Sequence, residues 1–407
     1  MKIRLIFPRW EALELRDLVP SPHPDMALIL AEFERFSETC GYALLILAAL
    51  TPSSIDVDIT DDFLEEIDYN EDVDLVGITA MTPQAYRAYE ISDRFREKGV
   101  PVILGGIHPS LLPEEAIQHA DSVLIGEAEN LWEKVLDDFQ NKRLKKIYKS
   151  EEKPDLTSFP LPRRELLKNK PCKVNIDVQP TRGCIYGCTI CNVPTMYGKK
   201  VRYRKLENVI EEMKTVNSDE IFLIEELTWM NPQYKEYYEK LFKMMIPLKV
   251  KFTTQTTTYR NIYVAGREFL ELMKKAGCIA ISFTQDEYIF DYYNKEKQSH
   301  LKKITQQLKD IGIPLLQYFY LGTEIENKDI FSRALEYAKQ SGIRSCLFFN
   351  LIPFPKTPFY DQLEKEGRLL TKDWSKYTGK YTVHSPKNMT SEELQEGVRW
   401  LWKEFYK

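Results

Sequence analysis

Short apolar segments alternate with helical segments over the first 140 residues, and this alternation constrains the fold more than any other feature of the sequence. The candidate strands are rich in Val, Ile and Leu and lie at 2–7, 55–59, 75–78, 102–105 and 123–125. Helical segments between them include 83–98 and 113–119. A repeated strand–helix–strand pattern requires a parallel sheet covered on both faces. The first part of the chain is therefore expected to be a doubly wound, Rossmann-like α/β domain.

A second strand–helix series follows a charged, proline-rich connector. Its candidate strands lie at 174–178, 220–224, 251–254, 279–283, 314–320 and 345–351. Six units running in one direction predict either an open sheet or a curved partial barrel. The chain ends in a predicted helix over 391–405, with Thr390 or Ser391 as its N-cap. The expected division is a first domain at 1–140, a linker at 141–172, a second α/β domain at 173–370 and a helical extension at 371–407.

Composition excludes several classes of protein. The 407 residues carry 56 Lys and Arg against 61 Asp and Glu, a formal charge of −5, which is too balanced for general nucleic-acid binding. The apolar run 42–50 is far shorter than the ~20 residues that span a bilayer. The opening MKIRLIFPRW is broken too early by Pro8 to be a signal peptide. Seven cysteines, an odd number, favour a reducing compartment, so we expect a cytoplasmic protein without a transmembrane segment.

The most specific motif is a Cys-x3-Cys-x2-Cys loop formed by Cys184, Cys188 and Cys191. Three soft thiolates on one loop are typical ligands of an iron–sulfur cluster. A structural zinc site needs a fourth ligand close by, and the nearest histidines, His119 and His300, are remote in sequence. Three ligands on a four-iron cluster leave one iron open for a small molecule. The motif therefore predicts a cluster that binds a ligand at its open iron.

This loop, placed after the first strand of a six-fold β/α series, resembles the radical S-adenosylmethionine (radical SAM) superfamily. The resemblance implies a partial (β/α)6 TIM barrel with a [4Fe-4S] cluster held by Cys184, Cys188 and Cys191. It also implies that the open iron binds S-adenosylmethionine, whose reductive cleavage gives a 5′-deoxyadenosyl radical. The electron would come from an external one-electron reductant such as flavodoxin or ferredoxin. Ile190 stands where the superfamily often has an aromatic residue, a departure that affects shielding and not ligation.

The preceding Rossmann-like domain extends the resemblance to the cobalamin-binding radical SAM enzymes. The stretches 350–360 and 366–375 resemble the branch that includes hopanoid-modifying enzymes, although this chain stops soon after them. The resemblance implies that three loops at the carboxyl edge of the first sheet bind cobalamin, through Thr79, Thr82, Gly105, Gly106, His108, Gly126 and Glu127. No Asp-x-His pattern occurs, so His108 is not expected to be a lower axial ligand. The alternative is a domain that keeps the fold but has lost the cofactor or uses the cleft for substrate.

Four further residues are assigned to S-adenosylmethionine by the same resemblance. They stand at the ends of the second, third and fourth strands of the second series: Glu225, Glu226, Gln255 and Asp286. The alternatives are a solvated acidic edge for the two glutamates and ordinary strand polarity for Gln255. The basic run 199–205 could pair with a phosphate or could be a solvated helix start. No catalytic residue is assigned.

These features predict a cobalamin-dependent methyltransferase that acts on an unactivated carbon through the deoxyadenosyl radical and methylcobalamin. The first alternative is radical chemistry without methylation, such as a cyclisation, ring contraction, carbon–carbon bond formation or oxidation. The second is an iron–sulfur and corrinoid protein that senses or carries without catalysis. The substrate is a small or lipid-like molecule, and the sequence does not separate a lipid from a tetrapyrrole, a peptide or a metabolite.

Overall fold

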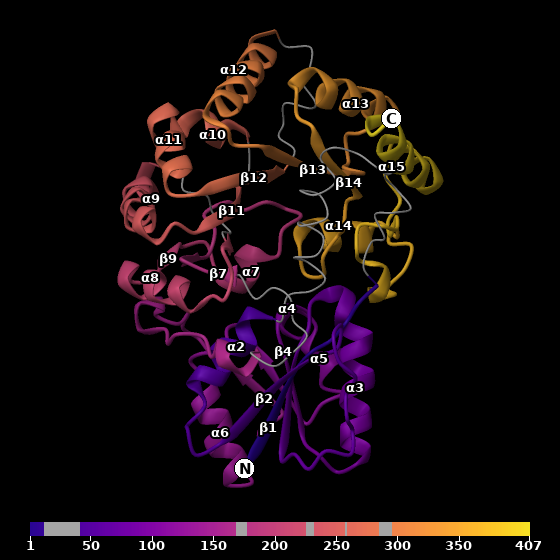
Figure 1. Cartoon of the computed structure of the whole chain (residues 1–407). Coiled ribbons are helices and arrows are strands. Elements are labelled where there is room, and N and C mark those ends of the chain that lie inside the picture. The colour runs from indigo at the N-terminus through magenta and orange to yellow at the C-terminus, as the bar shows by residue number, and fades with distance from the viewer. Residues whose placement is uncertain (12–40, 168–176, 225–231, 257–258, 285–294) are drawn as a thin grey trace.

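The structure is a computed structural model that describes residues 1–11, 41–167, 177–224, 232–256, 259–284 and 295–407. Two α/β units follow each other along the chain, the first in indigo and purple and the second from magenta to yellow (Figure 1). Within the described ranges, no helix combines the length and the apolar character that a membrane span requires.

The first unit is a parallel sheet in the order β2-β1-β3-β4-β5-β6. Its strands are β1 Lys2–Phe7, β2 Asp56–Asp61, β3 Leu75–Thr79, β4 Val102–Gly105, β5 Ser122–Ile125 and β6 Ile147–Lys149. The helices are α2 Tyr42–Leu50, α3 Ala85–Glu97, α4 Ile107–Leu111, α5 Pro113–Ala116 and α6 Trp132–Gln140, with the 3₁₀ helix η2 Thr82–Gln84 before α3. Apolar clusters fill both faces of the sheet. The predicted doubly wound domain is confirmed, and β6 adds a strand within the segment that we expected to be a linker.

The strand order fixes where this unit can bind a ligand. Neighbouring strands β1 and β3 lead to helices on opposite faces, so the sheet has its topological switch point between them. Ligands of open α/β sheets bind beside such a point, at the carboxyl ends of the strands. The loops that begin at Thr79, Gly105 and Gly126 all leave this edge.

The second unit is a parallel sheet in the order β7-β10-β11-β12-β13-β14, which follows the order of the sequence. Its strands are β7 Asp177–Val178, β10 Glu220–Leu223, β11 Lys251–Thr256, β12 Cys278–Thr284, β13 Leu315–Leu321 and β14 Ser345–Asn350. The helices are α8 Leu206–Thr215, α9 Pro232–Met245, α10 Tyr259–Ala265, α11 Arg267–Lys275, α12 Lys295–Ile311 and α13 Asp329–Ser341. Every pair of neighbouring strands is parallel, and the helices lie along the outside of the curved row (Figure 1). All six predicted strands are present, and the arrangement matches the predicted partial barrel.

Residue register shows which side chains face the inside of this barrel. Phe319 packs edge-on against a tyrosine of α13 and therefore points outward, so its neighbour Tyr318 points inward. Tyr318 lies beside Thr284 of β12. Two residues earlier on β12, Ser282 has the same orientation and lies beside Gln255 of β11. The register therefore places Gln255 on the inner face.

The C-terminal extension returns to the first unit. Helix α14 Pro358–Lys365 precedes it, and the extension itself contains the 3₁₀ helix η7 Trp374–Lys376 and α15 Ser391–Phe405. Trp374, Tyr377 and Val383 belong to the apolar core on the α3 side of the first sheet. Helix α15 packs on β14 instead, where the Trp402 ring meets Phe348. The predicted N-cap is Thr390, in a capping box whose other half is the side chain of residue 393.

Candidate cofactor site

The cysteine loop is closed at its base by a short hairpin. Strand β8 Thr181–Arg182 pairs antiparallel with β9 Arg202–Tyr203, and helix α7 Val193–Tyr197 lies between them. Gly183 has φ +102°, and a Cβ there would lie 2.4 Å from the Lys200 carbonyl oxygen. Only glycine allows the two limbs of the loop to cross this closely, which explains the glycine directly before the first cysteine.

The three cysteines differ in exposure: Cys184 is buried, Cys191 is half-buried and Cys188 is exposed. The amide of Cys191 donates to the Cys188 carbonyl over 3.2 Å, so the second and third cysteines share one tight turn. Among the described residues, no group of three Cys, His, Asp or Glu side chains converges on a single metal ion. A four-iron cluster binds each thiolate at a different iron, so thiols spread over one loop fit a cluster better than one ion.

The predicted S-adenosylmethionine residues are only partly described. Glu225, Glu226 and Asp286 lie outside the described residues. Gln255 lies on the inner face of the barrel, beside Ser282 in the strand register. The amide of Ile224, at the end of β10, donates to the Val178 carbonyl over 2.9 Å. The second barrel strand therefore ends beside β7, the strand that leads into the cysteine loop.

Gly106 and Gly126, two of the predicted cobalamin-binding glycines, differ in what surrounds them. A Cβ on Gly106, which has φ +92°, would lie 2.6 Å from Thr79 Oγ1 and 2.7 Å from the Ala80 amide nitrogen. Its lack of a side chain therefore lets the β4 loop pack against the β3 loop. A Cβ on Gly126, at φ +88°, would meet no atom of the described residues within 4 Å. Gly126 thus presents open backbone at the edge of the sheet.

Two buried polar atoms near this edge lack a hydrogen-bond partner among the described residues: Thr82 Oγ1 and His108 Nδ1. The His108 ring is fully buried, stands edge-on to Trp374, and places Nε2 3.3 Å from Glu115 Oε1. Trp374 Nε1 donates to the same Glu115 oxygen over 2.9 Å. The open backbone at Gly126 and the orphaned Thr82 hydroxyl fit a ligand rich in amide groups, such as cobalamin, whereas the enclosed His108 ring connects to the C-terminal extension.

Glu127 is buried in ion pairs that cross between the two units. Its carboxylate accepts from Arg182 Nη1 over 2.7 Å and from Arg202 Nη2 over 2.8 Å. Two arginines of the predicted basic run are thus engaged by buried carboxylates, Arg202 by Glu127 and Arg204 by Glu212 of α8. Neither the phosphate-binding nor the solvated alternative describes these two side chains. No local pattern in the sequence indicates these pairs, because Glu127 and Arg202 lie 75 residues apart.

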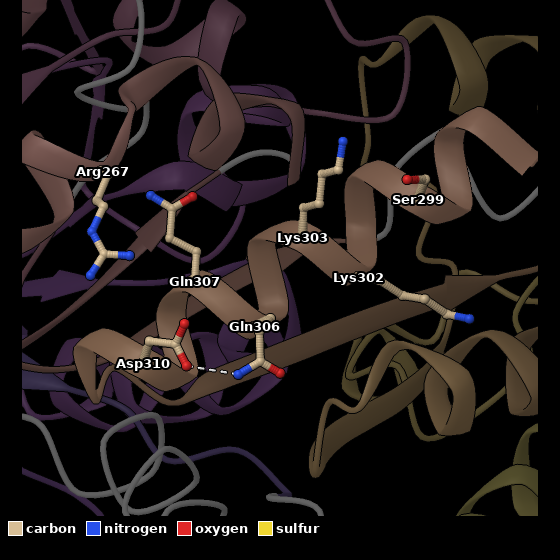
Figure 2. Close-up of a pocket in the computed structure, with 7 residues that line it drawn as sticks. All are labelled: Arg267, Ser299, Lys302, Lys303, Gln306, Gln307 and Asp310. Carbon is tan, nitrogen blue, oxygen red and sulfur yellow. Dashed lines mark hydrogen bonds between the residues drawn. The ribbon is translucent and has the colours of Figure 1, made fainter.

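A groove on the outer helix layer contains none of the predicted site residues. Figure 2 shows its lining side chains, which come from α11 and α12: Arg267, Ser299, Lys302, Lys303, Gln306, Gln307 and Asp310. Gln306 donates to Asp310 over 2.7 Å across one turn. All seven are polar or charged, whereas cofactor pockets are lined mainly by apolar side chains. We assign no cofactor to this groove.

Comparison with known proteins identifies both units. Residues 37–136 match the B12 binding domain, and residues 178–358 match the radical SAM superfamily. The chain is 31% identical over 368 residues to bacteriochlorophyllide d C-8(2)-methyltransferase of Chlorobaculum tepidum, covering 84% of this chain and 80% of that protein. The chain belongs to the cobalamin-binding radical SAM methyltransferases. The predicted family, and its character as an enzyme, are therefore confirmed.

Two further similarities are consistent with this family. The hopanoid C-2 methylase of Rhodopseudomonas palustris is 24% identical over 81% of this chain and 65% of its own length. The fold of TsrM, a radical S-adenosylmethionine methyltransferase from Kitasatospora setae solved with cobalamin and a [4Fe-4S] cluster, superposes with a TM-score of 0.66. That structure is 15% identical and covers 90% of this chain and 78% of its own chain, so it supports the fold alone. The cofactors of this radical SAM methyltransferase are a [4Fe-4S] cluster, S-adenosylmethionine and cobalamin.

Proposed function

We propose that this radical SAM methyltransferase adds a methyl group to an unactivated carbon of a planar tetrapyrrole. The observation that carries the proposal is the match of both cofactor modules together with a relative that methylates a bacteriochlorophyllide. A saturated carbon has no usable nucleophilicity, so polar methyl transfer fails and the cofactors must supply a radical route. When bound, the cluster and S-adenosylmethionine supply the deoxyadenosyl radical, and methylcobalamin supplies the methyl group.

The inner wall of the barrel supports a flat apolar substrate. Tyr318 and Tyr320 of β13 have nearly parallel rings, 7° apart with centroids at 6.4 Å. Phe349 of β14 stacks on both, at 6.1 Å from Tyr318 and 5.7 Å from Tyr320. Three rings in similar orientation form an aromatic wall on the face that also carries Gln255. Such a wall favours a planar conjugated ligand, since offset stacking rewards parallel rings.

In this proposal the chain's own residues bind and orient the reacting groups. Cys184, Cys188 and Cys191 hold the cluster, and Gln255 contacts S-adenosylmethionine or the substrate from the inner face of the barrel. The carboxyl edge of the first sheet, at Thr79, Gly105 and Gly126, holds the cobalamin.

The test begins with the cofactors and proceeds to the products. Protein purified anaerobically from cells supplied with cobalamin should contain about four irons and about one cobalt per chain. With a strong reductant, S-adenosylmethionine and a bacteriochlorophyllide, it should form S-adenosylhomocysteine and 5′-deoxyadenosine together with a methylated tetrapyrrole. Deoxyadenosine without S-adenosylhomocysteine would instead indicate a non-methylating radical reaction. Methylation of a hopanoid lipid but not of the tetrapyrrole would refute the substrate class.

A further inference from the structure

The base of the cysteine loop is bound by two carboxylates of the cobalamin-binding unit, Glu127 and Glu129, and Glu127 contacts both strands of the hairpin. Glu127 follows directly on Gly126, at the start of the loop after β5, and is 6% exposed. Arg182 reaches it from β8 and Arg202 from β9, with N–O distances of 2.7 and 2.8 Å. The second Glu127 oxygen also lies 3.0 Å from Arg202 Nη2. One side chain thus joins both strands of the hairpin to the edge of the other sheet.

The Arg182 guanidinium is held by several partners at once. Its Nη1 also donates to Glu129 Oε1 over 2.8 Å. Its Nε and Nη2 donate to Gln179 Oε1 over 3.1 and 2.9 Å. The guanidinium carbon lies 5.1 Å from the Phe159 ring centroid and 5.5 Å from that of Tyr197. A guanidinium held on this many sides has one geometry, because its donors form a rigid planar fork.

The hairpin is held to the barrel by its own contacts, since Thr181 Oγ1 lies 3.0 Å from the Tyr238 hydroxyl and the Tyr203 ring packs against Tyr237. Its link to the edge of the first sheet runs through the ion pairs with Glu127. Strands β8 and β9 are two residues long each, and so short a pair is not stable on its own. Breaking a buried ion pair leaves an uncompensated buried charge, so the hairpin cannot swing away from Glu127 without a large penalty. Cys184 lies two residues after Arg182, and Gly126 directly precedes Glu127. The ion pairs therefore lie between the two predicted cofactor loops.

We propose that Glu127 is a positioning residue that fixes the cysteine loop relative to the cobalamin edge, so that cluster and cobalamin keep one separation. This differs from the sequence expectation that Glu127 contacts cobalamin itself. The inference deepens the proposed function, since methyl transfer needs both cofactors to act at one substrate. A displacement of about 1 Å at a reacting centre can cost about 100-fold in rate, so a fixed separation has chemical value.

The test compares Glu127→Gln with Glu129→Gln in the holoenzyme. Both variants remove one carboxylate charge from the same loop, but only Glu127 contacts both strands of the hairpin. The first readout is the magnetic coupling between cob(II)alamin and the reduced cluster, measured by electron paramagnetic resonance in protein with wild-type iron and cobalt content. We expect a narrow distance distribution in the wild type and in Glu129→Gln, and a broadened one in Glu127→Gln.

The second readout is amide hydrogen exchange over residues 182–203, which needs no substrate. Loss of a charge-assisted buried hydrogen bond should raise exchange there on the order of 10- to 100-fold in Glu127→Gln. If that variant does not accumulate, Glu127→Asp, which keeps the charge one methylene shorter, should show a smaller rise in the same segment. Wild-type coupling and wild-type exchange in Glu127→Gln would overturn the inference. Neither readout depends on the tetrapyrrole, so failure of the proposed substrate leaves this test intact.

Discussion

Replacement of Glu212 by Gln should strongly destabilise the protein, because its carboxylate pairs with two buried guanidinium groups. Glu212 is fully buried on α8. It accepts from Arg164 over 2.7 Å, forms a short contact with Arg204, and lies 3.2 Å from the Tyr42 hydroxyl. Arg164 comes from the connector and Tyr42 from α2 of the first unit. The cluster therefore joins three parts of the chain around one negative charge.

The magnitude follows from the burial of the whole cluster. Removing one partner of a buried ion pair costs about 3–5 kcal/mol, whereas an exposed pair contributes about 0.2–1 kcal/mol. The neighbouring Glu211 supplies the matched control, since it pairs with Lys214 over 2.5 Å and its side chain is 57% exposed. Glu211→Gln makes the same chemical change one residue away, where solvent screens the charge.

Anaerobic urea denaturation followed by tryptophan fluorescence measures the difference. At equal slopes, the midpoint of Glu212→Gln should fall well below that of the wild type, and the midpoint of Glu211→Gln should stay close to it. A Glu212→Gln midpoint equal to that of Glu211→Gln would refute the reasoning. It would mean that the two guanidinium groups find solvent or other acceptors once the carboxylate is gone.

Three further predictions test the cluster loop, the first sheet and the acid response. Cys188→Ala should lose most of the bound iron and all deoxyadenosine formation, and unchanged iron would remove Cys188 from the ligand set. Gly126→Ala should lower the free energy of unfolding by about 1–3 kcal/mol because of its positive φ alone. Gly106→Ala should lower it further, because its Cβ would also lie too close to backbone atoms. Equal decreases in melting temperature for the two variants would contradict this. The hydrogen bond from Arg368 lowers the pKa of Glu324 from 4.5 to about 2. The ionised Glu324 therefore contributes its full stabilisation above pH 4.5 and loses it as the pH falls towards 2. Glu324→Gln should make the free energy of unfolding less dependent on pH between 4.5 and 2. An unchanged pH dependence would contradict this assignment.

The sequence predicts the architecture well because the relevant signals are local. Runs of Val, Ile and Leu between turn residues mark buried parallel strands, and all eleven predicted strand positions coincide with strands of the structure, 174–176 lying outside the described residues. Strand β6 was not predicted because it has only three residues, Ile147–Lys149, follows two lysines and is exposed at both ends. The capping box at Thr390 was readable for the same reason as the strands, since its partner lies three residues away.

The candidate site was only partly readable because its main contacts are long-range. The cysteine spacing identifies the cluster loop, but nothing near Glu127 indicates that its partners stand 55 and 75 residues later. The basic run illustrates the same limit, because local charge pattern does not distinguish an exposed cation from Arg204, which is 2% exposed. The role of Gly106 depends on the loop of another strand and emerges only once the sheet is assembled.

The return of the C-terminal extension to the first unit has a consequence for engineering this family. Tyr360, Trp374, Tyr377 and Val383 complete a core whose other buried members come from the first 125 residues. A cobalamin-binding module cut at the end of its own sequence match would expose that apolar surface to water. An exchange of the cobalamin-binding unit between relatives would have to include the C-terminal extension together with the N-terminal unit. A truncation behind the barrel should first destabilise the N-terminal unit.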